Sequence, residues 1–379
     1  MMVHLGEGEG RMRNNNERRL FVSATSQNDG KTSCSIGLLS ALQPYAEMVG
    51  FIKPVGQRYV MVGDAQVDED AVLIQRTFDL RQAIKDMNPV AVPQYFTRQY
   101  LDDPAQLHPG LVTSIEQAFR NVCAERDLIL IEGTGHAGVG SVFDLSNAYV
   151  AKLLAAKVII VTIGGIGNPV DEIALNRCLY EQAGVQVIGV IANKVIPEKL
   201  EQTRHYMTLA LERMGLPLFG VIPFAPSLTW PTMQQVADAL KARTINWHEG
   251  MQNAIASVVV GAMTPHNALT FLKDKSLLVV PGDRDDLVLA AASMDVLRED
   301  IQLAGLLFTG GILPQPQTID LLSRTKIPAL AVDCPTYEAA TRIQKLNVKI
   351  QITDEEKIQL ATTMVRDYVD VERIWNVLA

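Results

Sequence analysis

The sequence predicts an α/β protein in which helices cover parallel β-sheets. Short, continuous runs of Val, Ile and Leu alternate with helix-like stretches along most of the chain. Strands that are buried on both faces of a parallel sheet give such unbroken apolar runs rather than an alternating pattern. Because the chain has 379 residues and a domain typically has about 100–200, two domains are expected.

The first series of elements begins at residue 19 and ends at residue 242. Its strands are expected at residues 19–24, 48–55, 127–133, 157–165, 187–195 and 215–224. Its helices are expected at residues 30–45, 114–127, 171–184, 200–215 and 231–242. This alternation is typical of a parallel sheet with helices on both faces.

The pattern restarts around residues 245–252, where a second strand–helix series begins. Its apolar segments are residues 255–262, 268–273, 276–282, 287–297, 303–311 and 327–333. We therefore expect a flexible leader over residues 1–17, a first domain over 18–245, and a second, smaller α/β domain over 246–379 that includes a C-terminal helix. The leader is polar and lacks the apolar core of a signal peptide.

Composition argues against several classes of protein. The formal charge of −8 disfavours general affinity for nucleic acid, because phosphate backbones require clustered Lys and Arg. No apolar run reaches the roughly 18 residues that a membrane span needs. Cys34, Cys123, Cys178 and Cys334 form no CxxC pair, which fits a reducing compartment without a zinc site or a disulfide framework. The expectation is a cytoplasmic protein with neither a nucleic-acid nor a membrane partner.

A candidate phosphate-binding loop lies in FVSATSQNDGKTSCS, residues 21–35, between the first strand and the first helix. In such loops, backbone N–H groups and a helix N-terminus face the phosphates, a Lys reaches the terminal ones, and a Ser or Thr hydroxyl binds Mg²⁺. The usual GxxxxGK(S/T) spacing requires a glycine where Thr25 stands, and one additional loop residue moves that position to Ala24. A chance GKT at a strand–helix turn is the alternative. The candidate nucleotide-binding residues of the loop are Asn28, Asp29, Gly30, Lys31, Thr32 and Ser33.

A carboxylate, Glu132, ends one predicted strand and precedes a glycine-rich loop. P-loop enzymes place a residue that binds or orients Mg²⁺ at the C-terminal end of a buried strand. The glycines that follow, beginning with Gly133, favour a backbone that approaches a ligand closely. His136 lies in the same loop, where it could contact substrate or a phosphate, or could merely cap the loop.

Two charged residues lie at other strand ends and helix starts. Lys53 stands between an apolar run and Pro54, at the edge where strand C-termini form a ligand-binding crevice. Asp70 precedes an apolar helix, and ordinary N-terminal capping is the alternative explanation for it.

The strand at residues 187–195 carries Asn193 and Lys194 near its end, as in base recognition by many NTPases. The carboxylate that would select guanine is absent, because Ile196 stands in its place. Adenine is therefore the expected base.

Taken together, these positions resemble the dethiobiotin synthetase family, in which they occur in the same order. The matches extend over residues 18–243 and comprise Ala24 to Thr32, Lys53-Pro54, Asp70, Glu132-Gly133 and Asn193. The resemblance implies a P-loop NTPase-type sheet that binds ATP, with Mg²⁺ held by Thr32, Asp70 and Glu132. It also implies that Lys31 and Lys53 stabilise phosphates and a carbamate or another acyl-phosphate-like intermediate, and that Asn193 binds adenine.

The segment after Glu132, GTGHAGVGSVFDLSNAYVAK, departs from the synthetase pattern. It lacks the proline-containing stretch that faces the diamine in that family. It resembles instead the P-loop portion that precedes the catalytic domain in long bacterial phosphotransacetylases, or a cobyrinate-synthase-type ATPase.

The second series contains two short glycine-containing sequences, each after a predicted strand: Asp283-Arg284 and Thr309-Gly310-Gly311. They resemble the DRTGG domain, which occurs beside the P-loop module in long phosphotransacetylases and in some regulated pyrophosphatases. The resemblance implies a crevice for a ligand or an interface, and two glycine turns with a structural salt bridge are the alternative. In the phosphotransacetylase family an acetyl-transfer domain would follow.

Three functions follow from these resemblances. The first is an ATP-binding protein that activates a carboxylate or carbamate of a small-molecule substrate, or hydrolyses ATP, with a regulatory DRTGG domain. The second is a non-catalytic regulatory module in which a nucleotide or metabolite effector controls assembly with itself or with a partner enzyme. The third, ranked below both because of the loop after Glu132, is dethiobiotin synthetase itself. Family resemblance also implies a homo-oligomer.

Overall fold

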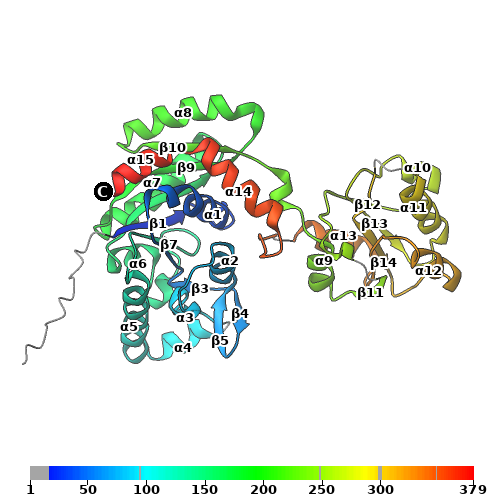
Figure 1. Ribbon diagram of the computed structural model, residues 1–379, viewed down its shortest axis with the longest axis horizontal. Helices are drawn as coiled ribbons and strands as arrows, with labels where there is room; N and C mark the ends of the chain where they lie inside the picture. Colours follow the sequence, from blue (N-terminus) through cyan, green and yellow to red (C-terminus); the bar gives the residue numbers. More distant parts are fainter. Residues whose placement is uncertain (1–16, 94, 247–248, 298–300, 347) are drawn as a thin grey trace, which may run out of the picture. The chain divides into compact units, whose positions relative to one another are not determined.

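The computed structural model describes residues 17–93, 95–246, 249–297, 301–346 and 348–379. It divides into two compact units, and Figure 1 shows the elements of each. Unit 1 comprises Met1–Phe224 and Ile350–Ala379, and unit 2 comprises Ala225–Lys349. The predicted leader lies outside the described residues except for Glu17.

The core of unit 1 is a six-stranded sheet with the order β10-β9-β8-β1-β7-β2. Every neighbouring pair is parallel, which confirms the fold class predicted from the unbroken apolar runs. The six strands are β1 (Arg18–Ala24), β2 (Val49–Ile52), β7 (Leu128–Glu132), β8 (Lys157–Ile163), β9 (Val187–Val195) and β10 (Leu218–Pro223).

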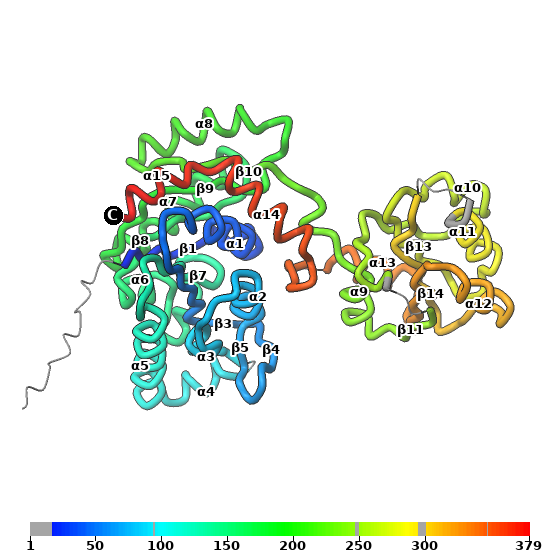
Figure 2. Tube along the Cα trace, in the orientation of Figure 1, coloured from blue at the N-terminus to red at the C-terminus, as the bar shows by residue number. Residues whose placement is uncertain are grey.

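Helices cover both faces of this sheet. One face buries alternate strand residues, such as Phe21 and Ile129, against four helices: α5 (Pro104–Cys123), α6 (Asn147–Leu153), α7 (Gly167–Gln182) and α8 (Leu200–Arg213). The other face is covered by α1 (Lys31–Leu42), α14 (Glu355–Tyr368) and α15 (Val371–Leu378). Figure 2 shows the two C-terminal helices, in red, beside α1, in blue.

Several short elements lie between β2 and α5, where the sequence predicted only the apolar helix at Asp70, which is α2. They form an antiparallel hairpin of β4 with β5 and a parallel pair of β3 with β6. The elements are β3 (Val55–Gly56), β4 (Tyr59–Val62), β5 (Ala65–Asp68), α2 (Glu69–Thr77), α3 (Ile84–Met87), β6 (Val90–Ala91) and α4 (Phe96–Asp102). Among the described residues, short 3₁₀ helices occur at Gln43–Tyr45, Ser141–Phe143, Pro197–Lys199, Pro226–Thr229 and Glu249–Gln252.

Unit 2 is built on a five-stranded sheet with the order β11-β15-β14-β13-β12. Four strands are parallel and β11 pairs antiparallel with β15. The strands are β11 (Arg243–Asn246), β12 (Ser257–Val260), β13 (Ser276–Pro281), β14 (Gly305–Thr309) and β15 (Ala329–Ala331). The helices are α9 (Met233–Leu240), α10 (Pro265–Leu269), α11 (Asp285–Leu297), α12 (Pro316–Leu322) and α13 (Thr336–Gln344).

The division into units differs from the predicted domains of 18–245 and 246–379. The helix α9, expected to close the first domain, buries Met233 and Val236 in the core of unit 2. One C-terminal helix was expected in the second domain, whereas the structure has two, α14 and α15, and both belong to unit 1. There the backbone N–H of Asp370 donates to the carbonyl of Phe219 at 2.8 Å. An amphipathic helix shows in its sequence that it buries one face, but not which sheet receives that face.

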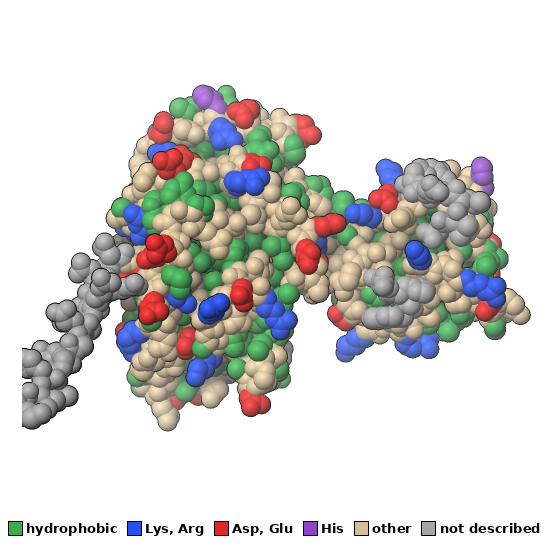
Figure 3. All heavy atoms as spheres, viewed as in Figure 1, with side chains coloured by type: hydrophobic (Ala, Val, Ile, Leu, Met, Phe, Trp, Pro, Cys, Tyr) green, Lys and Arg blue, Asp and Glu red, His purple; other side chains and the backbone are tan. Residues whose placement is uncertain are grey.

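Two surface properties bear on partners. In the described part of the chain, no helix combines the length and apolar character needed to cross a bilayer. On the face of unit 1 seen in Figure 3, side chains of both charge signs are interspersed.

Candidate functional site

The loop between β1 and α1 forms the centre of the candidate site. Ala24 is the last residue of β1 and α1 begins at Lys31, so residues 25–30 make the turn. Gly30 has φ +94° and Asn28 has φ 68°, both in the left-handed region that glycine adopts freely and asparagine tolerates. The glycine missing at position 24 is therefore not needed, because the chain at that position is still in the strand.

The carboxylate of Asp29 holds the loop from within. Its Oδ2 atom accepts a hydrogen bond from the backbone N–H of Ser26 at 2.6 Å and another from the hydroxyl of Thr25 at 2.8 Å. The Thr25 hydroxyl also lies 3.1 Å from that of Thr162 on β8. Asp29 is buried, so its side chain braces the loop, and only its backbone is left for the predicted contact with nucleotide.

The end of β9 clamps the same loop from the other side. Asn193 donates from Nδ2 to the backbone carbonyl of Asp29 at 2.9 Å, and Lys194 donates from Nζ to the carbonyl of Asn28 at 2.6 Å. A Cβ at position 30 would overlap the Nδ2 atom of Asn193, so the clamp requires Gly30. The structure thus brings Asn193 to the predicted site, where its carboxamide binds the loop backbone. Adenine recognition by Asn193 stays a prediction.

The N-terminus of α1 presents unpaired backbone donors to the loop. The N–H of Cys34 donates to Gly30 at 3.0 Å, and the N–H groups before it have no intrahelical acceptor, as at every helix start. The first turn of α1 contains no acidic residue. Lys31 lies at this end with Nζ 3.5 Å from the carbonyl of Ser26. Such a helix end, with a lysine beside it, favours an anion.

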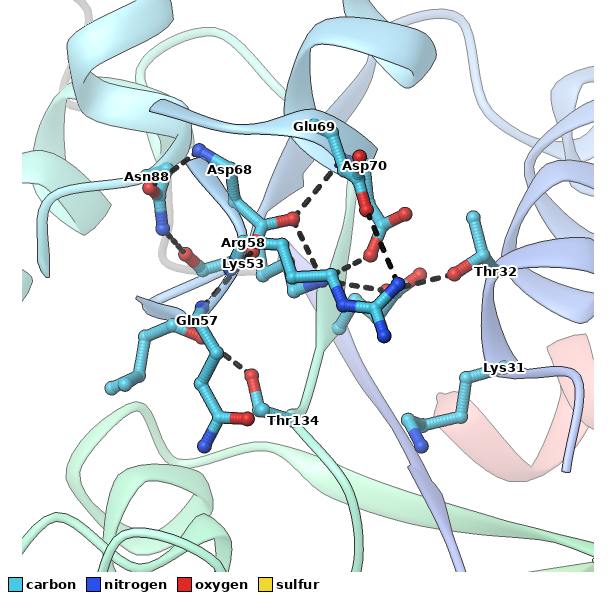
Figure 4. A network of polar contacts seen from close by, with 12 residues as sticks. Lys31, Thr32, Lys53, Gln57, Arg58, Asp68, Glu69, Asp70, Asn88 and Thr134 are labelled. Carbon is cyan, nitrogen blue, oxygen red and sulfur yellow. Dashed lines mark hydrogen bonds and ion pairs between the residues drawn. The ribbon is translucent and has the colours of Figure 1, made fainter. Parts of the chain in front are cut away.

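Beside the loop, a buried lysine is surrounded by carboxylates, as Figure 4 shows for Lys53, Asp68 and Asp70. The Nζ atom of Lys53 lies 2.9 Å from Asp68 Oδ1 and 3.5 Å from Glu132 Oε1, and it forms an ion pair with Asp70. All four side chains are at least 94% buried. Burial lowers the pKa of the Lys53 amine, but Asp70, Glu132 and Asp68 outweigh this and raise the pKa above its ordinary value. Lys53 is therefore an ammonium ion.

Two residues that the sequence did not single out as functional hold this cluster in place. Asp68 is the N-cap of α2 and accepts from the backbone N–H of Asp70 at 3.0 Å. Asn88 accepts from the N–H of Asp68 at 2.9 Å and donates to the carbonyl of Lys53 at 2.8 Å. The sequence VDED before an apolar helix signals the cap, whereas no local pattern reveals the role of Asn88.

Glu132 joins the lysine cluster to the loop. Its Oε1 atom accepts from the Thr32 hydroxyl at 3.3 Å, and its buried Oε2 atom has no hydrogen-bond partner among the described residues. Burial raises the pKa of the Glu132 carboxyl, and the Lys53 ammonium opposes this shift only in part. A buried carboxylate oxygen without a partner is costly, and it is the kind of atom that a bound cation would satisfy.

Of the three predicted Mg²⁺ ligands, Thr32 and Glu132 are adjacent, and Asp70 and Glu132 are both paired with Lys53. Within the described ranges, no three His, Cys, Asp or Glu side chains are arranged to hold a metal ion. Mg²⁺ at nucleotide sites usually takes only one or two protein ligands, with water and phosphate oxygens completing its shell. The hydroxyl of Thr32 and the unpartnered oxygen of Glu132 fit that kind of site.

The loop after Glu132 is held by its own contacts. Asn147 accepts from the N–H of Thr134 at 3.1 Å and donates to the carbonyl of His136 at 2.6 Å. His136 is exposed, and its Nδ1 accepts from the N–H of Gly138 at 3.2 Å. A Cβ at Gly133 would lie 2.6 Å from the ring of Phe21. These contacts favour loop capping for His136 and close packing for Gly133 over the predicted substrate contacts.

A residue of α7, Asn176, links this loop to the phosphate loop. Its Oδ1 accepts from the N–H of Ala137 at 2.8 Å, and its Nδ2 lies 3.4 Å from the carbonyl of Thr25. No local sequence pattern identifies Asn176, because both of its partners are far from it along the chain.

In unit 2 the predicted ligand residues lie at the carboxyl ends of two neighbouring strands, β13 and β14. The Arg284 guanidinium donates to Asp286 at 2.8 Å and to the carbonyls of Gly261 and Met263 at 3.2 Å and 2.9 Å. The side chain of Asp283 is exposed. Arg284 is thus occupied by protein acceptors.

The TGG residues are also paired within unit 2. The hydroxyl of Thr309 is 2.7 Å from that of Thr336. The N–H groups of Gly310 and Gly311 each donate to a backbone carbonyl at 3.0 Å, and both glycines have positive φ. Together with the contacts of Arg284, this pairing favours the structural alternative, two glycine turns and a salt bridge, over a preformed ligand crevice.

Comparison with known proteins gives matches over most of the chain. The AAA domain family matches residues 18–232, and the DRTGG domain matches residues 235–346. The phosphate acetyltransferase of Pseudomonas aeruginosa is 30% identical over 375 residues, which cover 93% of this chain and 51% of that protein. That of Synechocystis sp. is 25% identical over 369 residues, which cover 95% and 51%. The chain therefore spans about half the length of the curated relatives that it matches.

Among solved structures, the MinD cell division protein of Aquifex aeolicus covers 55% of this chain and 83% of its own, at 14% identity and a TM-score of 0.35. That score is too low to support an inference. The predicted fusion of a P-loop module with a DRTGG domain, as in phosphotransacetylases, is confirmed by the matches to families and relatives.

Proposed function

Because the chain belongs to the AAA domain family and carries a DRTGG domain, we propose that unit 1 binds Mg²⁺-ATP at the loop between β1 and α1. The observation that carries this proposal is the preformed loop of residues 25–30. Asp29 braces it from within, β9 clamps it from outside, and the N-terminus of α1 points unpaired donors at it. A loop that is already ordered loses little conformational entropy when phosphates bind.

Each side chain around the loop has its own proposed contact with the phosphates or with Mg²⁺. Lys31 reaches the terminal phosphates, and the N–H groups at the start of α1 hold the phosphate chain. Thr32 and Glu132 hold Mg²⁺, which when bound neutralises charge on the phosphates. Lys53 keeps Asp70 and Glu132 in place until an anionic group arrives. Positioned positive charge of this kind is what phosphoryl transfer requires.

The reaction that fits this arrangement best is ATP-dependent activation of a carboxylate or carbamate, or hydrolysis of ATP. A regulatory module without catalysis is the second candidate. It is favoured by the engagement of Lys53 with three carboxylates rather than with open solvent. Dethiobiotin synthetase stays third, because the loop after Glu132 lacks the proline-containing stretch of that family, and because the His136 ring accepts from Gly138 in its own loop and Gly133 packs against Phe21 of β1.

Calorimetric titration of Mg²⁺-ATP into the wild type and Lys31→Ala tests the binding site. We expect the variant to lose most of the affinity, because a charge-assisted contact is worth about 1.5–3 kcal/mol. The matched control is Lys85→Ala, which removes an exposed lysine of α3 and should bind as the wild type does. Equal affinity in wild type and Lys31→Ala would contradict the proposal.

The candidate functions are distinguished by the release of ADP from ATP, measured with and without diaminononanoate and bicarbonate. Turnover that depends on both would identify the synthetase, and slow turnover without either would indicate an ATPase. Binding without any turnover would favour the regulatory module. The homo-oligomer that the family resemblance implies is tested by light scattering, and a monomer at all concentrations would contradict it.

A further inference from the structure

The buried cluster of Lys53, Asp68, Asp70 and Glu132 has more negative than positive charge. Within the cluster one ammonium is paired with three carboxylates, a formal net charge of −2 when all are ionised (1 − 3), and the nearby Lys31 ammonium, which lowers the pKa of Glu132, reduces the local excess to −1 (2 − 3). Asp68 and Asp70 come from one acidic run at the junction of β5 and α2, whereas Lys53 and Glu132 come from distant parts of the chain, so the cluster is assembled by the tertiary fold. The Oε2 atom of Glu132, a member of the same cluster, is buried without a hydrogen-bond partner of good geometry among the described residues, and the Ser35 hydroxyl is the polar group beside this carboxyl that lowers its pKa.

The ammonium of Lys53 lies close to the place between Thr32 and Glu132 that a divalent cation would occupy. Its Nζ atom is 3.5 Å from Glu132 Oε1, and the Thr32 hydroxyl is 3.3 Å from the same oxygen. A cation between Thr32 and Glu132 would therefore lie close to a buried ammonium, and like charges in a medium of low dielectric constant repel strongly. In the observed cluster Lys53 is the cation paired with Asp68, Asp70 and the Oε1 atom of Glu132.

We propose that Lys53 is a resident cation that excludes a divalent metal until an anionic ligand draws the ammonium away from Asp70 and Glu132. The identity of the ligands, a phosphate-bearing nucleotide and Mg²⁺, rests on the proposed function. The consequence is reciprocal coupling, in which the anion and the divalent cation each raise the affinity for the other through Lys53. Lys53 acts as a positioning residue in this scheme.

The test measures metal binding and not turnover. Mn²⁺, which gives an electron paramagnetic resonance signal that is lost on binding, is titrated into the full chain with and without ADP. The Mn²⁺–ADP equilibrium is measured separately and subtracted. In the wild type we expect Mn²⁺ to bind weakly alone and at least about fivefold more tightly with ADP, the lower end of typical couplings.

Removing the ammonium should remove the coupling. In Lys53→Met we expect Mn²⁺ to bind without ADP at least about tenfold more tightly than in the wild type, and ADP to add little. Because three buried carboxylates without a cation could prevent folding, the charge-balanced variant K53M/D68N is measured in parallel. Asparagine keeps the cap of α2, and two carboxylates, Asp70 and Glu132, remain for the metal. Lys85→Met, on the surface of α3, is the matched control and should behave as the wild type.

Each outcome decides the inference. Gain of Mn²⁺ binding without ADP in K53M or K53M/D68N supports it. Equal affinity for Mn²⁺ in the wild type and K53M/D68N, measured without ADP, overturns it. It is also overturned if the wild type binds ADP but its affinity for Mn²⁺ stays the same. If ADP binds to neither the wild type nor K53M/D68N, the proposed nucleotide site is wrong. The metal titration without ADP still decides whether Lys53 excludes the cation.

Discussion

The clamp of β9 on the phosphate loop makes a quantitative prediction for Gly30→Ala. Gly30 has φ +94°, and a Cβ there would overlap the Nδ2 atom of Asn193. The left-handed backbone costs an alanine about 1–2 kcal/mol. Displacement of Asn193 removes its 2.9 Å hydrogen bond to the carbonyl of Asp29, which is worth about 1 kcal/mol. The closed form of the loop should therefore lose about 2–3 kcal/mol.

Amide hydrogen exchange measures this loss directly. A change of about 2–3 kcal/mol corresponds to about 30- to 150-fold faster exchange, since each 1.4 kcal/mol is tenfold, in peptides that cover the loop and the first turns of α1. Mass spectrometry of peptides from the intact protein separates this segment from unit 2, so two-state unfolding need not be assumed.

The control is Gly63→Ala in the β4–β5 hairpin. Gly63 also has a positive φ, +60°, but a Cβ there would meet nothing within 4 Å. This variant should change exchange only in its own hairpin and leave the phosphate loop as in the wild type. If Gly30→Ala exchanges like the wild type in the loop segment, the clamp does not stabilise the loop and the reasoning fails.

Three other changes test the same structure. Asn193→Ala should speed exchange in the phosphate loop by about 5- to 30-fold, for a loss of about 1–2 kcal/mol, and unchanged exchange would contradict the clamp. Burial raises the pKa of the Cys34 thiol to about 12, so at pH 8.5 only about one molecule in 3,000 carries the reactive thiolate. Iodoacetamide should accordingly label the exposed Cys178 long before Cys34. Equal labelling rates for the two cysteines would show that Cys34 is accessible. Because the Cys34 thiol loses its proton at lower pH in the unfolded chain than in the folded one, the free energy of unfolding should fall as pH rises above about 8.5. Urea unfolding of unit 2 tests the contacts of Arg284. Arg284→Ala should lower the free energy of unfolding by about 1–2 kcal/mol, a value discounted for the partial exposure of the side chain. Arg324→Ala, which breaks an exposed ion pair, should leave the urea midpoint almost unchanged.

The sequence predicted the parts of the site that follow from strand order alone. Glu132, Lys53 and Asn193 each stand at or near the carboxyl end of an apolar run, and parallel strands bring those ends to one edge. The GKT sequence identified the loop because it is a local motif at a strand–helix turn. The strand–helix alternation also predicted both α/β units, since buried parallel strands have a distinctive composition.

The supporting residues could not be predicted, because their partners are distant in sequence. Asn88, Asn147 and Asn176 bind backbone groups that are up to 151 residues away, and no local pattern records such a partner. The return of α14 and α15 to unit 1 was missed for a related reason. Their apolar faces predict burial, but two α/β sheets in one chain offer equivalent places to bury them.

The central claim, that the preformed loop holds the phosphates of a nucleotide, is tested most directly by a crystal structure with Mg²⁺ and a non-hydrolysable ATP analogue. We predict phosphate oxygens within hydrogen-bond distance of the N–H groups from Gly30 to Ser33, with Thr32 and Glu132 beside the metal. The bond from Asn193 to Asp29 should persist. A nucleotide bound elsewhere, with the loop empty and Lys53 still paired with Asp70 and Glu132, would contradict the account.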